Sequence, residues 1–200
     1  MQTQIRLFDD VIGQSLAVSL LQAAISKEAV APAYIFSGPE GVGRRLTALR
    51  FLEGVLGSGE PDRRTRRRLE DLNHPDLLWV EPSYTHQGRL VSQSRADAEG
   101  VSKKTPPQIR LEQVRGITSF LARQPVEGSR GMIVIEEAES MPEAAANALL
   151  KTLEEPANGL LILICSAPQR LLSTIRSRCH EIIFDRLNSS AIEKVLRKLD

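Results

Sequence analysis

The sequence predicts an α/β fold in which a parallel sheet of five strands is flanked by helices. Five short runs are apolar almost throughout, which is typical of strands that are buried on both faces of a sheet. Helical patterns lie between most of these runs, and strands that alternate with helices indicate a layered α/β domain. The strands are expected at Ala33–Ser37, Leu77–Val80, Met132–Ile135, Leu160–Ile164 and Glu181–Phe184.

Helices are predicted where apolar residues recur with the period of a helix turn. They are expected at Leu16–Ile25, Arg45–Leu56, Leu111–Ala122, Ala144–Leu153 and, as a short segment, Leu171–Arg176. The polar stretch 83–108 is rich in Ser and Gly and predicts a mobile insertion or a hairpin on this scaffold. A last helix is expected from Ser190, where Glu193 completes a capping box. Because it runs to Asp200, the chain is expected to be a fragment whose next domain is missing.

The composition excludes several classes of protein. With 26 basic and 25 acidic residues among 200, the overall charge indicates no particular partner. The first residues contain no apolar signal region, and no segment reaches the roughly 18 apolar residues that a membrane span needs, so we expect a cytoplasmic protein with no membrane contact. The two cysteines, Cys165 and Cys179, form no CxxC pair, which leaves too few ligands for a four-ligand zinc site.

Residues 38–45, GPEGVGRR, lie between a predicted strand and a predicted helix, which is the setting of a phosphate-binding loop. Gly38 and Gly43 have the spacing of the motif G-x-x-x-x-G-K-[ST]. Gly41 contributes to a tight turn whose backbone amides converge on an anion. The sequence therefore predicts the architecture of a phosphate loop.

The two residues that handle phosphate and metal in that motif are replaced by arginines. Arg44 keeps a positive charge, but its planar head is larger than an ammonium group. Arg45 removes the hydroxyl that binds Mg²⁺ and brings a cation to the place where the metal would lie. Thr47 is no substitute, because two helical residues rotate its side chain by about 200°. We expect the loop without its metal chemistry.

An acidic pair, Glu136 and Glu137, ends the strand predicted at Met132–Ile135. In P-loop ATPases an Asp at the first position holds Mg²⁺, and a Glu at the second polarises the attacking water. Here Glu136, one methylene longer than Asp, is at the metal position, and Glu137 is at the base position. The alternative is a pair of solvated acids at a strand end, but the phosphate loop upstream favours the remnant of a nucleotide site.

Six segments, spread over nearly the whole chain, carry a family resemblance. They are FDDVIGQ at 8–14, the loop at 38–45, NHPDL at 73–77, IRLEQVR at 109–115, ANALLKTLEEP at 146–156 and TIRSRC at 174–179. Together they resemble the clamp loader of bacterial DNA polymerase III, an assembly of the AAA+ family. The degenerate loop makes the chain most similar to the delta-prime type of subunit and less similar to the ATP-hydrolysing gamma/tau type.

The resemblance implies an AAA+ domain at 1–186 with the sheet order 5-1-4-3-2, the start of a small helical lid domain at 187–200, and a collar domain outside the chain. It places Ser166 where AAA+ ATPases keep a polar sensor residue, although a serine at a strand end also serves as an ordinary hydrogen-bonding group. It also singles out Arg178, because the Ser-Arg-Cys arginine of clamp loaders reaches the γ-phosphate of ATP that the neighbouring subunit holds.

The function that the resemblance implies is that of a clamp-loader subunit without ATPase activity of its own, which helps to load the sliding clamp onto primed DNA. Its partners would be the gamma/tau and delta subunits, with the clamp and primer-template DNA contacted through the complex. Neighbouring subunits would bind ATP and Mg²⁺, so no cofactor is expected for this chain. The four-cysteine zinc module of many family members is not expected either, because the stretch 57–73 contains no cysteine.

Two other functions stay open at this point. An independent ATPase with an atypical loop would use Arg44 to bind phosphate. A nucleic-acid-binding module would use the basic block Arg63–Arg68, in which five of six residues are arginine. That block has no interleaved aromatic residues and is therefore more typical of a solvated face.

Overall fold

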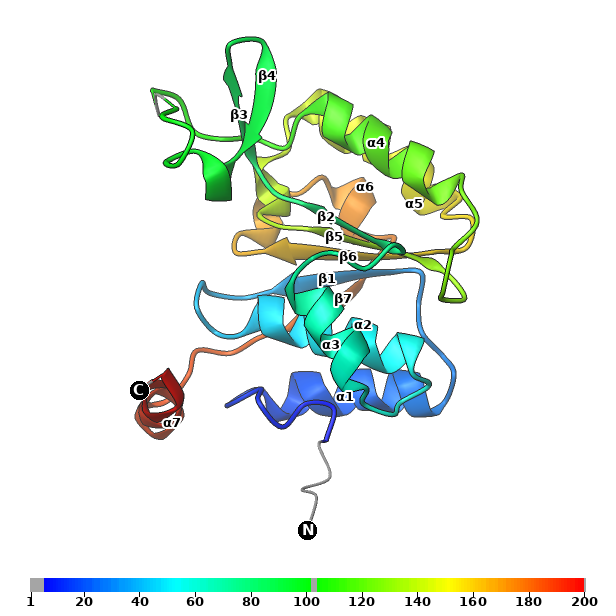
Figure 1. Cartoon of the computed structure of the whole chain (residues 1–200), viewed down its shortest axis with the longest axis vertical. Coiled ribbons are helices and arrows are strands. Elements are labelled where there is room, and N and C mark those ends of the chain that lie inside the picture. Colours follow the sequence, from blue (N-terminus) through cyan, green and yellow to red (C-terminus); the bar gives the residue numbers. More distant parts are fainter. Residues whose placement is uncertain (1–5, 102–103, 200) are drawn as a thin grey trace.

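The computed structural model describes residues 6–101 and 104–199, which form a five-stranded parallel sheet between two layers of helices (Figure 1). The strands are β1 (Ala33–Ser37), β2 (Leu77–Val80), β5 (Gly131–Ile135), β6 (Gly159–Cys165) and β7 (His180–Ile183). Their order across the sheet is β7-β1-β6-β5-β2, which is 5-1-4-3-2 when the five are counted along the chain. The predicted fold class and strand order are confirmed.

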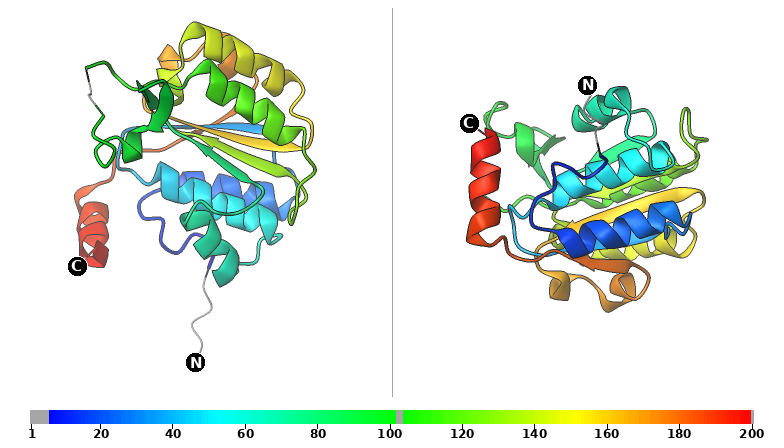
Figure 2. Two further views of the ribbon diagram at one scale, coloured as in Figure 1. Left: turned by 45° about the horizontal axis from the view of Figure 1, so that its top comes forward. Right: turned by 90° about the horizontal axis from the view of Figure 1, so that it is seen from below.

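Apolar side chains cover both faces of the sheet. Successive side chains of a strand point to opposite faces, so an apolar run supplies both. In β1, Tyr34 and Phe36 belong to the core under α1 and α2, whereas Ala33 and Ile35 belong to the core under α4, α5 and α6. Figure 2 shows α1 and α2 on one side of the sheet and α4 and α5 on the other. These helices are α1 (Ser15–Ser26), α2 (Arg44–Leu56), α4 (Leu111–Leu121), α5 (Glu143–Glu154) and α6 (Ser173–Arg176).

The polar stretch after β2 contains a hairpin, which is one of the two structures predicted for residues 83–108. β3 (Ser83–His86) pairs antiparallel with β4 (Arg89–Ser92). Tyr84 and Val91 belong to a small apolar core that is separate from the two main cores. Residues 102–103 of the predicted insertion lie outside the described residues.

The basic block is a helix that the sequence analysis missed. α3 (Arg63–Glu70) begins after Asp62, whose carboxylate accepts a hydrogen bond from the Thr65 amide at 2.7 Å. Leu69 is its buried residue, so the apolar periodicity that reveals the other helices is absent from this segment. The capping signal alone was too weak to predict the helix.

Ion pairs hold two arginines of α3 against the rest of the domain. Arg66 pairs with the buried Glu53 of α2 at 2.8 Å, and Arg68 pairs with Glu127 at 2.6 Å. Both arginines already pair with carboxylates, and the Arg66–Glu53 pair is the more buried of the two. The exposed arginines of the block are Arg63, Arg64 and Arg67.

The last helix is capped differently from the prediction. α7 (Ser189–Leu199) begins after Asn188, whose side-chain oxygen accepts a hydrogen bond from the amide three residues on at 2.9 Å. Glu193 pairs with Arg197 at 2.6 Å one turn further along the helix. The capping box predicted at Ser190 was therefore wrong, because asparagine is an equally good N-cap and starts the helix earlier.

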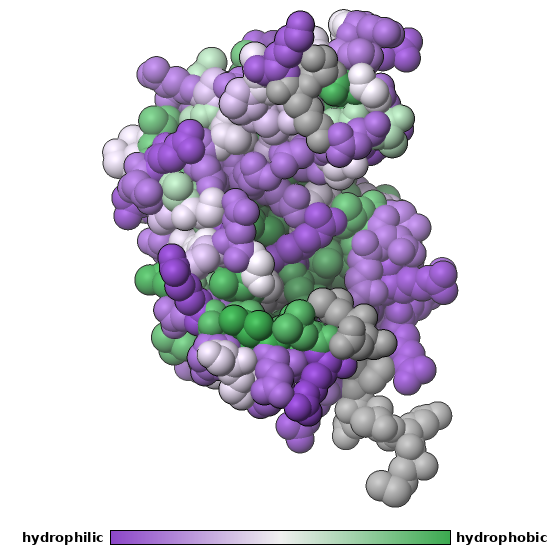
Figure 3. Space-filling model, turned by 90° about the vertical axis from the view of Figure 1, so that its left-hand side faces the viewer, coloured by the Kyte–Doolittle hydropathy of each residue, from purple (hydrophilic) through white to green (hydrophobic). Residues whose placement is uncertain are grey.

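α7 exposes apolar side chains on one side. Ile192 and Leu196 are 46% and 58% exposed, and residues four apart lie on the same side of a helix. Figure 3 looks at the side of the molecule that carries α7 and shows a green band beside purple side chains. Leu187 and Val195 line an apolar hollow that Leu46 of α2 also lines. α7 therefore borders the region of the phosphate loop.

The remaining short elements are single turns of 3-10 helix, namely η1 (Gln93–Arg95), η2 (Ala138–Ser140) and η3 (Pro168–Arg170). Within the described part of the chain, no helix has both the length and the apolar character that crossing a bilayer requires.

Candidate functional site

The loop after β1 has the backbone geometry of a phosphate-binding loop. A Cβ on Gly38 would lie 2.3 Å from the carbonyl oxygen of Phe184, so glycine is required at this position. Gly41 and Gly43 have φ values of 75° and 97°, which glycine adopts without strain. Apart from the adjacent residues, no described atom lies within 4 Å of a Cβ built on either residue, so nothing packs against the turn in that direction.

The structure brings the predicted site residues together at one edge of the sheet. The loop, the acidic pair and Ser166 follow β1, β5 and β6, and the carboxyl ends of parallel strands share an edge. They border an open hollow of about 490 Å³. Every residue predicted for this site except Gly38 lines the hollow, together with Glu40, Leu46 and Ile164.

Arg45 forms an ion pair with the first residue of the acidic motif. Its Nη1 atom lies 2.9 Å from Oε1 of Glu136, and its guanidinium carbon lies 4.8 Å from the ring centre of Trp79. The Glu136 side chain is 18% exposed. Burial raises the pKa of this carboxyl, and the charge of Arg45 acts against that rise. A guanidinium therefore lies against the carboxylate at the metal position.

The residues of this edge do not fit a bound Mg²⁺ ion. Position 45 has no hydroxyl group, and the hydroxyl of Thr47 donates a hydrogen bond to the carbonyl of Gly43 at 2.8 Å. Glu136 faces a positive charge that a divalent cation would have to displace. Glu137 has the left-handed φ of 45°, and burial raises its pKa. This set of residues therefore lacks the ligands that a magnesium ion needs at this edge.

Arg44 differs from Arg45 in its surroundings. It is 8% exposed, and within the described residues its side chain makes no hydrogen bond and no ion pair. Its Nη1 atom is buried without a partner. Burial lowers the pKa of Arg44, and the nearby carboxylate of Glu139 acts against that effect. The loop thus contains a positive charge with no direct counter-charge.

Ser166 is hydrogen-bonded to Glu139, a residue that the sequence analysis missed. Oε1 of Glu139 accepts hydrogen bonds from the amide and the hydroxyl of Ser166 at 2.8 and 2.5 Å, and from the amide of Ala167 at 3.1 Å. Despite burial, these hydrogen bonds hold the pKa of Glu139 below its ordinary value. The signal was present in the sequence, because Glu139 lies two residues after the acidic pair, in EEAE.

Arg178 lies at the opposite edge of the sheet from the phosphate loop. It precedes β7, and in the parallel pairing of β1 with β7, Tyr34 is opposite His180. The loop begins after Ser37, three residues further along β1, which corresponds to about 10 Å at the rise of a strand. Arg178 is therefore outside the site formed by the chain's own loop.

The Arg178 side chain is held by a surface ion pair. Its Nη2 atom donates to Oε1 of Glu154 at 2.8 Å, and its Nη1 atom donates to the carbonyl of Thr174 at 3.0 Å. The side chains of Arg178 and Glu154 are 37% and 53% exposed. Exposed ion pairs contribute only about 0–1 kcal/mol, so Arg178 can exchange this partner for another at little cost.

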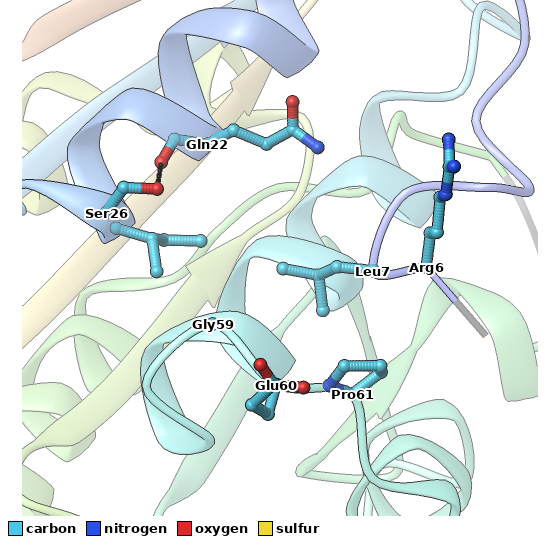
Figure 4. Close-up of a pocket in the computed structure, with 8 residues that line it drawn as sticks. Arg6, Leu7, Gln22, Ser26, Gly59, Glu60 and Pro61 are labelled. Atoms are coloured by element: carbon cyan, nitrogen blue, oxygen red, sulfur yellow. Dashed lines mark hydrogen bonds between the residues drawn. The ribbon is translucent and has the colours of Figure 1, made fainter. Parts of the chain in front are cut away.

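A second hollow, of about 460 Å³, lies at the end of α2 that is remote from the loop (Figure 4). Gln22 and Ser26 of α1 line one side, and Gly59–Pro61 line another. This is part of the stretch 57–73, for which the family resemblance raised the question of a zinc module. The lining of the hollow contains neither cysteine nor histidine, the two residues that bind structural zinc best.

We expect the protein to bind no stoichiometric zinc. The described residues contain no group of three or more His, Cys, Asp or Glu side chains that would hold a metal ion. Elemental analysis after incubation with excess zinc and dialysis should find well below one equivalent per chain, the same as for chelator-treated protein. One tightly held zinc per chain would contradict this prediction.

Solved structures with the same fold belong to AAA+ proteins. The DNA polymerase III gamma subunit-related protein of Thermotoga maritima aligns with a TM-score of 0.59 at 20% identity, covering 91% of this chain and 49% of its own. The RuvB Holliday junction branch migration motor of the same organism aligns with a TM-score of 0.56 at 14% identity, covering 98% of this chain and 53% of its own. These low identities establish the fold alone.

Sequence comparison establishes the family. The model of a family described as DNA polymerase III, delta subunit, matches residues 13–188. DNA polymerase III subunit delta' of Bacillus subtilis is 33% identical, covering 94% of this chain and 52% of that relative. The delta' subunit of Pseudomonas aeruginosa is 34% identical, covering 74% of this chain and 42% of that relative. The chain thus spans about half the length of these relatives, and it belongs to the DNA polymerase III delta subunit family, in which it is similar to the delta' subunits.

Proposed function

We propose that this chain is part of a clamp-loader subunit that does not hydrolyse ATP and that supplies Arg178 to the ATP site of a neighbouring ATPase subunit. The partners are the gamma/tau and delta subunits, and the sliding clamp and primer-template DNA are contacted through the assembly. In this proposal residues 1–186 are the AAA+ domain, and α7 begins the lid domain. The observation that carries the proposal is the ion pair between Arg45 and Glu136.

The ion pair opposes ATP hydrolysis for an electrostatic reason. A P-loop ATPase needs Mg²⁺ between the β- and γ-phosphates and the carboxylate at the end of the strand. Here a guanidinium already neutralises that carboxylate and also stacks on Trp79, so a metal ion has to displace two favourable contacts. The same contacts make an independent ATPase that uses Arg44 the weaker hypothesis. Similarly, the ion pairs of Arg66 and Arg68 weaken the hypothesis of a nucleic-acid-binding block.

We expect no Mg²⁺-dependent binding of ATP by this chain. Calorimetric titration with ATP should give the same isotherm in excess Mg²⁺ and in EDTA, because the residues of the loop edge offer the metal no site. Arg45→Thr is the informative variant, since it restores the hydroxyl and releases Glu136. Micromolar binding to the unchanged chain that disappears in EDTA would falsify the prediction.

A further inference from the structure

The strand β2 forms one edge of the parallel sheet and leaves part of its backbone unpaired. Among the described residues β2 pairs with β5 alone, and the amides of Met132 and Glu136 donate to the carbonyls of Asp76 and Val80 at 2.8 Å. The backbone polar groups of successive residues in a strand point to opposite sides, so those of Trp79 point away from β5. No backbone group in the described part of the chain bonds to them there. This edge can therefore pair with a further strand.

An apolar hollow of about 360 Å³ lies beside this edge, between β2 and α4. Leu78 and Val80 line it from the strand, and both face the core that α4 covers. Residues of α4 at intervals of three or four, which share one side of a helix, form the other wall. They are Gln113, Gly116, Phe120 and, just beyond the helix, Arg123. A strand added at this edge would direct every second side chain toward the hollow.

Gly116 keeps the hollow open at the middle of α4. Glycine inside a helix is unfavourable relative to other residues. Apart from the adjacent residues and the backbone of the helix itself, no described atom lies within 4 Å of a Cβ built on Gly116. Packing inside the domain therefore does not require a glycine here. What its missing side chain provides is room for an occupant from outside.

The charge of the hollow indicates what that occupant carries. Gln113 is already used, because its side chain donates to the carbonyl of Glu81 and accepts from the amide of Arg110, both at 2.8 Å. Arg123 is the one charged residue of the lining. It is exposed, and among the described residues its side chain has no hydrogen bond or ion pair. An acidic residue of the occupant would complement this charge.

The shape of the hollow argues against a second copy of this chain. Another copy would bring the same concave surface and the same arginine, so the two hollows would face each other unfilled. An extended segment is convex, and its backbone matches the unpaired edge of β2. The free edge, the hollow and the charge together fit a segment of a different protein.

We propose that the β2 edge and this hollow bind an extended segment of another protein, apolar at alternate positions and with an acidic residue at the Arg123 end. Its backbone pairs with Trp79, its apolar side chains fill the hollow beside Gly116, and its carboxylate pairs with Arg123. The surface lies at the opposite edge of the sheet from β7, so the proposal does not depend on the role of Arg178.

The test is calorimetric titration of the full-length protein that contains this chain. The probes are short synthetic peptides in which Val, Ile or Leu alternates with Thr, with Asp at one end or the other, and matched peptides with Lys in place of Asp. We expect the Asp peptides to bind up to about 5-fold more tightly at low salt, and the preference to fade at high salt, because Arg123 is exposed. Hydrogen exchange of the Trp79 amide should slow when a peptide is bound.

Gly116→Leu is the decisive variant, because its side chain occupies the hollow. The variant should melt at the same temperature or higher, since leucine is a better helix former than glycine and the new Cβ meets no described atom of another element. Its affinity for the Asp peptides should be at least about 10-fold lower, the equivalent of one apolar side chain that no longer finds a buried place. The variant thus separates loss of binding from loss of folding.

Ala122→Leu is the matched control, because Ala122 directly follows α4, is exposed and does not line the hollow. It introduces the same side chain and should bind the peptides as the unchanged protein does. Arg123→Gln should still bind but lose the preference for Asp over Lys. The proposal is overturned if no Asp peptide binds, if Asp and Lys peptides bind equally at low salt, or if Gly116→Leu binds as tightly as Ala122→Leu. Self-association that Gly116→Leu abolishes would place a second copy in the hollow and would likewise overturn it.

Discussion

Replacing Arg178 with alanine is expected to impair ATP hydrolysis at the site of the neighbouring subunit while leaving the fold intact. Arginine fingers contribute about 10³- to 10⁵-fold to phosphoryl transfer in well-studied systems. The total turnover of a loader should fall by less, because its other ATP sites keep their own arginines. The measurement uses the full-length protein in a reconstituted clamp loader, with ATPase stimulated by clamp and DNA, and clamp loading, as readouts.

The geometry of Arg178 provides the controls for this experiment. Glu154→Gln breaks the 2.8 Å ion pair but keeps the arginine, so it should have little effect on turnover. Arg176→Ala removes an exposed arginine two residues away and should also have little effect. Arg178→Lys should lose activity, because an ammonium group cannot present two parallel donors to a phosphate.

One experimental result would contradict the proposed role of Arg178. If a loader with Arg178→Ala assembles normally and then hydrolyses ATP and loads clamps at the unmutated rate, Arg178 does not act on the neighbouring site. The chain would then be a passive scaffold within its assembly. A loss of assembly would also contradict the prediction, because the Arg178 side chain is at the surface and, among the described residues, its ion pair is the one with Glu154.

Replacing Arg50 with methionine is expected to lower the free energy of unfolding by about 1.5–3 kcal/mol, the usual contribution of hydrogen bonds to charged groups, because the acids that lose their partner are partly exposed. The Arg50 side chain is 4% exposed and lies 2.5 Å from carboxylate oxygens of both Asp10 and Glu70. The buried Glu53, one turn further along α2, has an oxygen at 3.8 Å. The variant leaves Asp10 and Glu70 without the charge that links the N-terminal segment, α2 and α3, whereas Glu53 keeps its ion pair with Arg66.

The effect of Arg50→Met should depend on pH in a defined direction. Despite burial, Arg50 holds the pKa of Asp10 below its ordinary value. A lowered folded-state pKa contributes stability that is present above the unfolded pKa, near 3.9, and is lost as the pH falls through the folded pKa. The difference in stability between variant and unchanged protein should therefore be full at pH 7 and shrink in strong acid.

Urea unfolding at both pH values measures the effect of Arg50→Met, and Arg67→Met is its control. Arg67 is 85% exposed and lies 3.7 Å from Asp71, so its removal should change stability by less than about 0.5 kcal/mol. If Arg50→Met costs no more than Arg67→Met, the acids around Arg50 are solvated well enough to need no counter-charge.

The sheet, and the meeting of the site residues at one of its edges, were predictable from the sequence for physical reasons. β1, β2, β5 and β6 are almost wholly apolar because both faces of the sheet are covered, so their signal does not depend on knowing the fold, whereas the edge strand β7 begins with His180 and Glu181. Gly38, Glu136 and Ser166 each follow a strand, and the carboxyl ends of parallel strands necessarily lie at one edge. Strand order came from the family resemblance, because apolar runs alone do not specify which strands are neighbours.

Contacts between distant side chains were not predictable. The sequence placed Arg45 near the metal position, but the approach of its guanidinium to Glu136, 91 residues away, and to Trp79 depends on the packing of three elements. The NHPDL motif marked the family without revealing a role. In the structure Asp76 accepts hydrogen bonds from three consecutive amides at 126–128, which fixes the segment before β5. The helix α3 was not predicted, because it is held by ion pairs with charged residues of other elements and lacks an apolar periodicity.

The Arg45 guanidinium is a counter-ion that the chain carries with it. A metal ion occupies a carboxylate site according to its concentration, so the charge of such a site rises and falls with the supply of the ion. An arginine is attached to the backbone and remains protonated throughout the physiological range. The charge at Glu136 is therefore the same whether magnesium is scarce or abundant, and this edge of the domain keeps one constant electrostatic surface.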